Sequence, residues 1–241
     1  MRRMRHLKPR EIQGCQLALD ASIATSLYDA TSGGSLVAAD GAVARWEDQS
    51  GNGRHATQAT SGARPLRRIG GVNGFDALEF DGTDDRLIFT LAGADPNTMI
   101  ATCRWENTGQ AGTRGIMAFG SVNDPAGGML LMQPTTGSQI GTFTGSLRYS
   151  TYTATSSPFS AALIDPGSGT CDFWVNGKSA GAGVSGNPVG QFQNHIGGST
   201  DSPVQYTNMR MSTAAIYSSA LSAFVVKRAT QSNMRKWRIN G

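Results

Sequence analysis

Turn-forming dipeptides divide this sequence into short segments, and their spacing restricts the chain to folds built from many brief strands. The 241 residues include 31 glycines, which follow no triplet repeat. Asn73-Gly74, Asp81-Gly82 and Asn176-Gly177 are dipeptides typical of hairpin turns. Beside these turns apolar and polar residues alternate, as at Leu78 and Phe80, which is the pattern of a strand with one buried face. Strands at intervals of about ten residues predict an antiparallel β-sandwich rather than a parallel-sheet fold.

A single domain is expected over residues 15–241, because all-β sandwiches of about 200–250 residues commonly form one unit. The last segment, about 222–237, predicts a short helix with Ser222 as its N-cap and basic residues in its final turn. The expected strands are 15–22, the alternating segment around Leu78 and Phe80, 98–105, 115–119, 128–133, 146–149, 158–164, the hairpin at 171–178, 193–197 and 209–217.

Basic residues gather at the two ends of the chain. Residues 1–11 carry a net charge of +4 and residues 224–241 carry +5, so within a total of +4 the remaining 12–223 carry −5. The excess of basic residues is therefore confined to the ends of an acidic body. No specific nucleic-acid binding is expected from such a charge distribution.

The first 14 residues are expected to form an extended basic arm, which has too few apolar residues to fold alone. Pro9 disfavours helix around Lys8. The arm either stays free in solution or docks on an acidic partner. Since it precedes the first apolar strand, the sandwich is expected to survive without it. The predicted docking residues are Arg2, Arg3, Arg5, Lys8 and Arg10.

Neither a membrane span nor a disulfide framework is expected. No stretch approaches the run of about 18 apolar residues that a transmembrane helix needs. No apolar segment follows the basic N-terminus, so export by the general secretory route is not expected. Cys15, Cys103 and Cys171 are odd in number and lack CxxC spacing, which predicts free thiols and suits a reducing cytosol.

Several short motifs follow one another in an order typical of one family. They are Leu17-Ala-Leu-Asp20-Ala-Ser22, Trp46-x-Asp48-x-Ser50-Gly-Asn-Gly53-x-His55-Ala56, Arg64-Pro65, Leu78-x-Phe80-Asp-Gly82-x-Asp84-Asp85, Phe173-x-Val-Asn-Gly177, Ile196-Gly-Gly198, Ile216-Tyr217-x-x-Ala-Leu-Ser222 and Lys236-Trp237. Together they make residues 15–238 resemble the concanavalin A-like, laminin-G-like (LamG) jelly rolls of bacterial surface proteins and phage virion proteins. The resemblance implies a concave and a convex antiparallel sheet, and binding of glycans or proteins, in some members with calcium.

The arrangement of carboxylates in the sequence indicates that the protein is not an enzyme. Glycanases of this fold resemble one another in an E-x-D-x-x-E strand, whose two carboxylates form a retaining pair. None of the four glutamates of this chain begins or ends that pattern. Glu79 and Asp81 have strand spacing, but Asp81 belongs to the Asp-Gly turn. The histidines, His6, His55 and His195, accompany no Gly-x-Ser-x-Gly elbow, so a nucleophilic triad is not expected either.

Clustered aspartates leave calcium open as a cofactor. Asp81, Asp84 and Asp85 offer the hard oxygen ligands that calcium prefers, without the spacing of an EF-hand. The alternative is a β-turn in which the aspartate side chains bind backbone amides. A second loop, with Asp48, Ser50 and Asn52, presents the same two alternatives.

Sugar-binding sites usually expose aromatic platforms, and aromatic residues make up 7% of this chain. Trp46 and Trp174 lie in strand patterns and Trp237 belongs to the predicted helix, so these three are expected in the core. Trp105 lies next to Arg104 at the end of a strand, and it is the predicted platform for a glycan.

Two functions of different classes follow from these features. The first is a structural protein of a phage virion surface, a capsid decoration or a tail or adhesin component. It would be made in the host cytoplasm and would dock on other virion subunits. The alternative is a carbohydrate-binding, lectin-like module of a bacterial surface or secreted protein, which would be extracellular. Neither function involves a membrane, and both are compatible with an oligomer.

Overall fold

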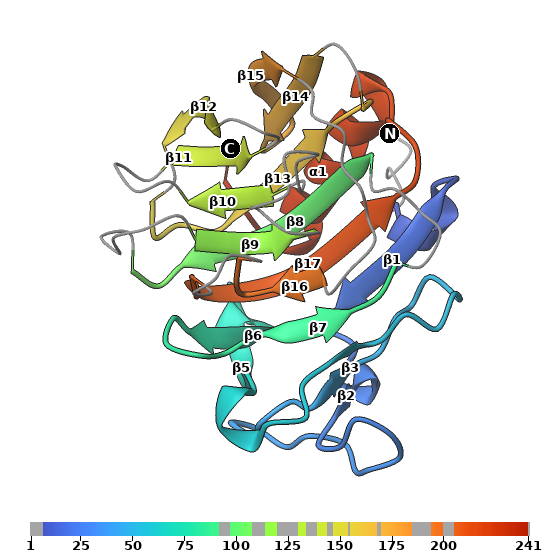
Figure 1. Cartoon of the computed structure of the whole chain (residues 1–241), viewed down its shortest axis with the longest axis vertical. Coiled ribbons are helices and arrows are strands. Elements are labelled where there is room, and N and C mark those ends of the chain that lie inside the picture. The colour runs from blue at the N-terminus through green and yellow to red at the C-terminus, as the bar shows by residue number, and fades with distance from the viewer. Residues whose placement is uncertain are drawn as a thin grey trace.

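A computed structural model of the chain describes residues 7–91, 97–107, 114–119, 130–133, 139–143, 147–153, 155–167, 170–184, 194–199 and 205–240. These residues form two antiparallel sheets that lie face to face, and a single helix, α1 (Ala223–Lys236), lies behind one of them (Figure 1). The all-β sandwich with a C-terminal helix is therefore confirmed.

The first sheet, sheet A, has eight strands in the described part of the chain, with β17 (Asn208–Tyr217) at its centre. One edge of β17 pairs with β8 (Thr98–Trp105), and the other pairs with β6 (Phe75–Asp81) and then β1 (Cys15–Asp20). The sheet continues beyond β6 and β8 through β5 (Leu66–Val72), β13 (Phe159–Ile164), β14 (Thr170–Val175) and β15 (Lys178–Val184).

The second sheet, sheet B, has nine strands among the described residues, several of them only two or three residues long. Three 3-10 turns lie between strands or precede them: η1 (Pro9–Glu11), η2 (Ala24–Ser26) and η3 (Ser61–Ala63). The strands of sheet B, in spatial order, are β12 (Leu147–Thr153), β11 (Gln139–Phe143), β10 (Leu130–Gln133), β9 (Arg114–Ala118), β16 (Asn194–Ile196), β7 (Leu87–Phe89), β4 (Ala56–Thr57), β3 (Arg45–Trp46) and β2 (Leu27–Tyr28).

The main core lies between the two sheets and follows the predicted alternation. Leu78 and Phe80 of β6 are fully buried in it, whereas Glu79 between them faces outward. Gly197, just after β16, passes so close to Phe80 that a Cβ at this position would lie 2.2 Å from the phenylalanine Cδ1. The backbone of Gly197 also has a φ of +87°. Only glycine meets both conditions without strain.

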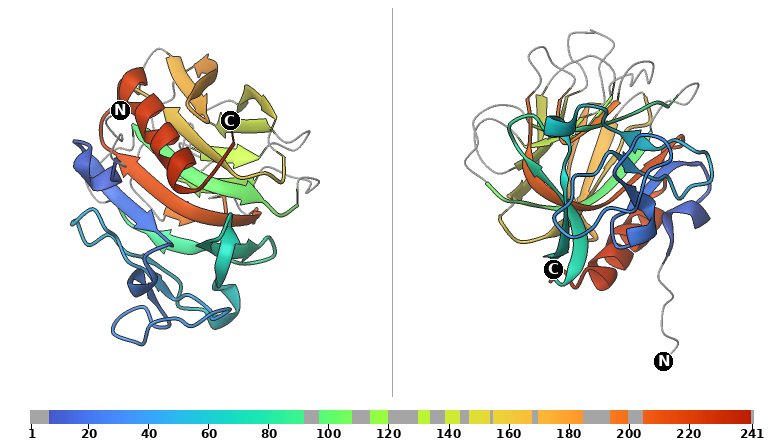
Figure 2. Two further views of the ribbon diagram at one scale, coloured as in Figure 1. Left: turned by 180° about the vertical axis from the view of Figure 1, so that it is seen from behind. Right: turned by 90° about the horizontal axis from the view of Figure 1, so that it is seen from below.

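Helix α1 lies on the outer face of sheet A (Figure 2). Ser222 Oγ accepts a hydrogen bond of 3.4 Å from the amide of Val225, so the predicted N-cap is confirmed. Val226 and Ala229 of the helix are buried against residues of sheet A, in a second, smaller cluster that we call the outer cluster. It comprises Ile100, Ala162, Ile164, Ala215, Tyr217, Val226 and Ala229.

The N-terminal segment departs from the predicted extended arm. Leu7 and Ile12 pack against the outer cluster, and the amide of Leu7 donates a hydrogen bond of 2.9 Å to Ser232 Oγ of α1. Pro9 begins η1, where its fixed φ suits a helical turn and its missing N–H is not needed. Residues 7–14 therefore belong to the domain, because Leu7 and Ile12, two apolar residues of this basic segment, pack against the outer cluster. Removing them would uncover part of the outer cluster.

Candidate functional site

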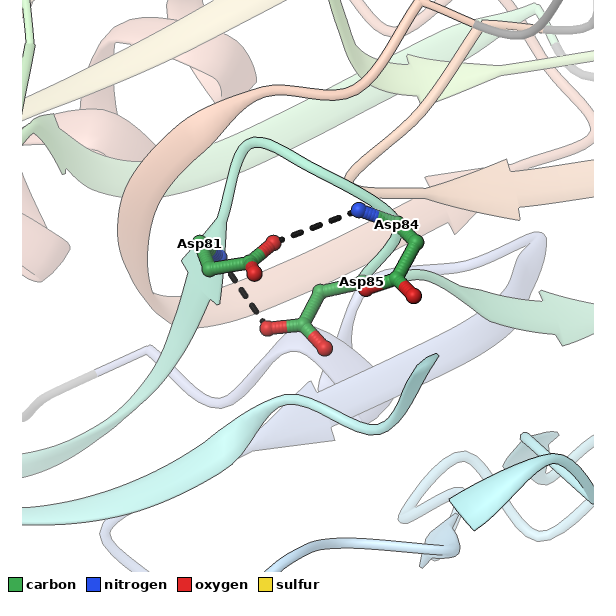
Figure 3. A group of neighbouring side chains, drawn as sticks. All are labelled: Asp81, Asp84 and Asp85. Atoms are coloured by element: carbon green, nitrogen blue, oxygen red, sulfur yellow. Dashed lines mark hydrogen bonds between the residues drawn. The ribbon is translucent and has the colours of Figure 1, made fainter. Parts of the chain in front are cut away.

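The three aspartates predicted as calcium ligands meet in the turn between β6 and β7 (Figure 3). One carboxylate oxygen of each of Asp81, Asp84 and Asp85 lies within 4.8 Å of the others. Asp81 Oδ1 accepts hydrogen bonds from the amides of Thr83 at 2.7 Å and Asp84 at 3.3 Å, and Asp85 Oδ2 accepts one from the amide of Asp81 at 3.0 Å. The carboxylates thus already stabilise the turn, as the alternative to a metal site requires.

Asp85 is the buried member of this acidic turn. Its pKa is raised from 3.8 to about 6, first by desolvation and then by the charges of Asp81 and Asp84, against the opposing hydrogen bond from the Asp81 amide. A divalent cation would relieve this repulsion. Asp81 and Asp84 are exposed, and their oxygens are the hard ligands that calcium binds. The three carboxylates therefore suit two roles: they could bind a calcium ion, and they also bind the backbone amides of their own turn.

The second predicted calcium loop has a structural role instead. The carboxylate of Asp48 accepts four hydrogen bonds from protein donors: the amides of Ala18 at 2.9 Å, Ser50 at 2.8 Å and Arg54 at 3.1 Å, and Ser50 Oγ at 2.6 Å. Asn52 Nδ2 donates to the carbonyl of Cys15 at 3.0 Å. These bonds tie the loop to β1 and occupy the oxygens that a metal would need.

Trp105 is not the glycan platform that the sequence predicts. The side chain is fully buried, and its ring centroid lies 5.6 Å from that of Phe159. Trp105 is separated by multiples of two residues along β8 from Met99, Ala101 and Cys103, so it points to the same side of the sheet, and all three face the core. The exposure of Trp105 is therefore decided by the alternation of side chains between the two faces of the strand, and not by its position next to a loop. Trp46 and Trp237 are buried as predicted, and Trp174 is partly buried against the outer cluster.

Glu79 lies in a network of charges on the outer face of sheet A. It contacts Arg68 at 2.7 Å, and it accepts a hydrogen bond of 2.7 Å from Arg210 Nε. Desolvation raises the pKa of Glu79, but the hydrogen bonds and charges of the two arginines outweigh it and hold the pKa below the ordinary value. A general acid needs a raised pKa. Glu79 is thus suited to holding strands together rather than to protonating a leaving group.

A pocket that sequence reasoning missed lies where η1, β1, β17 and α1 meet. Its cavity measures about 260 Å³, and we call it the basic pocket. Lys8 and Arg10 of the N-terminal segment line it together with Lys236 of α1. The predicted docking residues Lys8 and Arg10 are therefore brought to a site, while Arg2, Arg3 and Arg5 lie outside the described residues. The sequence signal for this site was the basic charge at both ends of the chain, since each end contributes to the lining.

No helix in the described ranges is long and apolar enough to cross a membrane. No protein-family model matches the sequence, and no curated protein matches it.

Solved structures with the same architecture do match. Domain 4 of AbnA, an extracellular GH43 arabinanase of Geobacillus stearothermophilus in complex with arabinotriose, matches with a TM-score of 0.61 and 12% identity over 90% of this chain and 98% of that domain. The chain shares the fold of these β-sandwich domains. The binding domain of botulinum neurotoxin serotype D matches with a TM-score of 0.61 and 11% identity over 92% of this chain, which spans 51% of the toxin domain. Trypanosoma rangeli sialidase matches with a TM-score of 0.60 and 14% identity over 93% of this chain and 33% of the sialidase.

Proposed function

We propose that the domain is a non-catalytic carbohydrate-binding module of the laminin-G-like kind. One observation carries the proposal: the similarity to arabinanase domain 4 spans almost the full length of both chains, and that domain was solved with arabinotriose. The similarity to a toxin binding domain supports the same reading. The ligand of this chain would accordingly be a glycan.

The absence of catalysis is part of the proposal. Among the described residues, the only glutamate placed two positions from an aspartate along a strand is Glu79, and it is engaged by two arginines that lower its pKa. Asp81, its neighbour by strand spacing, is bound to turn amides. Two carboxylates held in this way supply neither the acid nor the nucleophile of a retaining glycosidase.

Calcium is the metal we propose for the acidic turn. Asp81, Asp84 and Asp85 would hold it, and the ion would supply a fixed positive charge near the end of β6. The pKa of Asp85 is raised first by desolvation and then by the charges of Asp81 and Asp84, and a cation would balance those charges.

A second candidate function is a structural protein of a phage virion surface, docked on acidic subunits. The observation that favours it is that Lys8 and Arg10 from the N-terminal segment and Lys236 from α1 line one pocket. A co-purification assay at low and high salt tests it, because exposed ion pairs weaken as salt screens them.

The main proposal is tested on an array of immobilised glycans, with the unfolded chain as a control for non-specific binding. We expect saturable binding to a restricted set of glycans. Uniform binding to all of them, or to none, would count against a lectin-like module.

A further inference from the structure

The basic pocket is the one feature of the described residues that combines depth, uncompensated charge and an unsatisfied polar group. We propose that it binds a single sugar residue bearing a carboxylate, of the uronic-acid or sialic-acid class. The inference rests on the proposed carbohydrate-binding function and adds to it the ligand class and the location of the site.

The walls of the pocket come from four elements that are far apart in the sequence. Ala18 of β1 and Thr213 of β17 line it from sheet A, and Pro9 of η1 and Asn233 and Lys236 of α1 line it as well. A cavity of about 260 Å³ lies just below the range of about 300–1,000 Å³ typical of sites for drug-sized ligands. It therefore suits one sugar ring better than an extended chain.

Thr213 lines the pocket and carries a buried hydroxyl. The residue is 5% exposed, and its Oγ1 has no hydrogen-bond partner in the part of the chain that the structure describes. A register shift after Met211, where β17 pairs with β8, precedes the threonine. A buried hydroxyl without a partner destabilises the free protein, and a ligand hydroxyl that reaches it would offset this cost.

The charges around the pocket favour an anion. Lys236 forms an ion pair with Asp20, whose other oxygen accepts hydrogen bonds from both the amide and Oγ of Ser22, so the charge of this aspartate is balanced. Within the described residues, neither Lys8 nor Arg10 has an ion-pair partner. Glu11 accepts a hydrogen bond of 3.3 Å from the amide of Lys8 but does not line the pocket. A carboxylate at the entrance would meet Lys8 and Arg10.

Asp20 and Gln49 also line the pocket, and the rest of its lining includes apolar side chains. Pro9, Leu19 and Ile23 line it, and Ile23 is 37% exposed. A sugar ring presents C–H groups on one face and hydroxyls at its edge, so it matches a site that is apolar on one side and polar on another. Inorganic phosphate would satisfy the charges but leave the apolar wall uncovered. This mixture of properties distinguishes a carboxylated sugar from a simple anion.

The test is a titration followed by amide chemical shifts of the ¹⁵N-labelled full chain. Its ligands are the methyl glycosides of glucuronic acid and of N-acetylneuraminic acid, with methyl glucoside as the neutral match and inorganic phosphate as the simple anion. We expect at least one acidic glycoside to shift the amides of Ala18, Gln49 and Thr213, with a Kd about tenfold or more below that of methyl glucoside. The two acidic ligands distinguish a uronic-acid site from a sialic-acid site.

Two variants address the pocket and one serves as a matched control. The double variant Lys8→Gln/Arg10→Gln and the variant Thr213→Val should each raise the Kd about three- to tenfold. The double variant Lys227→Gln/Arg228→Gln removes the same charge from exposed positions of α1 that do not line the pocket, and it should leave the Kd within about twofold. Thermal unfolding of each variant establishes that a loss of binding is not a loss of fold.

The outcomes separate the inference from the function on which it rests. If phosphate or methyl glucoside binds as tightly as the acidic glycosides, or if a glycan binds while the amides of the pocket stay unmoved, the carboxylated-sugar site is wrong and the carbohydrate-binding function survives. If none of these sugars and no arrayed glycan shifts any amide, both are wrong.

Discussion

Arg210 Nε donates a hydrogen bond of 2.7 Å to Glu79 Oε2 and so joins β17 to β6 across the outer face of sheet A. Arg68 of β5 contacts the other oxygen of the same carboxylate at 2.7 Å. Three neighbouring strands are therefore linked through one side chain. This carboxylate is also the one that a glycanase would most need, so its environment bears on both stability and function.

Replacing Glu79 by glutamine should lower the free energy of unfolding by about 1–2 kcal/mol at pH 7, because Arg68 and Arg210 lose the carboxylate that they share. Arg68 keeps its ion pair with Asp40, and Arg210 keeps the one with Glu106. The folded pKa of Glu79 lies below its ordinary value of 4.5, so the stabilisation is complete above pH 4.5 and disappears as the pH falls through the folded pKa. Urea unfolding of both proteins across this pH range measures the effect. Glu47→Gln is the control, since among the described residues Glu47 has one ion-pair partner, Arg45 at 3.3 Å. An equal loss in the two variants would refute the network.

Gly197→Ala should destabilise the protein by about 2–4 kcal/mol, because the new Cβ collides with Phe80 and the backbone keeps a positive φ. Gly74→Ala separates the two causes. Gly74 has a φ of +89°, close to that of Gly197, and a Cβ there would meet nothing within 4 Å. Chemical denaturation should give a loss of about 1 kcal/mol for the control. Equal losses would show that the close approach to Phe80 contributes nothing.

Asp85→Asn should stabilise the folded protein at pH 7.5 and have little effect below pH 3.8. The folded pKa of about 6 is above the ordinary 3.8, so ionisation of Asp85 disfavours the folded state as the pH rises through this interval. A shift of this size corresponds to at most about 3 kcal/mol, which solvent beside the turn reduces to about 1–2 kcal/mol. Thermal melts of the two proteins at a series of pH values, without calcium, measure the difference. A variant that is less stable than the wild type at pH 7.5 would contradict the assignment.

Calcium at about 5 mM should raise the Tm of the wild-type protein, because a ligand that binds only the folded state stabilises it. Asp84→Asn is the diagnostic variant. Among the described residues no hydrogen bond reaches the Asp84 carboxylate, so the turn should keep its stability while losing a ligand. The calcium response of this variant should be smaller than that of the wild type. An unchanged response, or no response in either protein, would mean that the turn is capped by its own aspartates alone.

The three cysteines should remain free and react slowly in the folded protein. Cys15, Cys103 and Cys171 lie on β1, β8 and β14, and every pair is separated by at least one intervening strand. Strands two apart are about 9–10 Å from each other, beyond the Cα separation of about 7 Å that a disulfide can span. Burial raises the pKa of Cys15 to about 12 and that of Cys171 to about 11, so thiolates are scarce near neutral pH. A thiol assay should find three groups after denaturation and little fast reaction before it.

Local patterns were sufficient to predict most elements of the fold. The predicted strand 98–105 coincides with β8, and 209–217 differs from β17 by one residue, because alternation and turn residues act over a few positions. β11 (Gln139–Phe143) was missed, since Gly141 interrupts its apolar pattern. Trp105 was wrongly predicted to be exposed because it lies next to a loop. It points to the same side of β8 as the buried Cys103.

The basic pocket could not be predicted in the same way. Lys8 and Lys236 stand at opposite ends of the sequence, and they meet because Leu7 packs against the outer cluster that α1 also covers. Charge at the termini indicated a binding surface, but only the tertiary packing of an apolar residue inside a basic segment brings the charges together. Long-range packing of this kind leaves no periodic signal in the sequence.

The central claim, a module that binds glycans without cleaving them, is tested most directly by one NMR experiment on the protein with a glycan selected from the array. Protein amide shifts report binding, and the anomeric proton signals of the glycan report cleavage in the same tube. We predict saturable amide shifts together with anomeric signals that stay constant over days. New reducing-end signals, or a glycan that shifts no amide at millimolar concentration, would contradict the account.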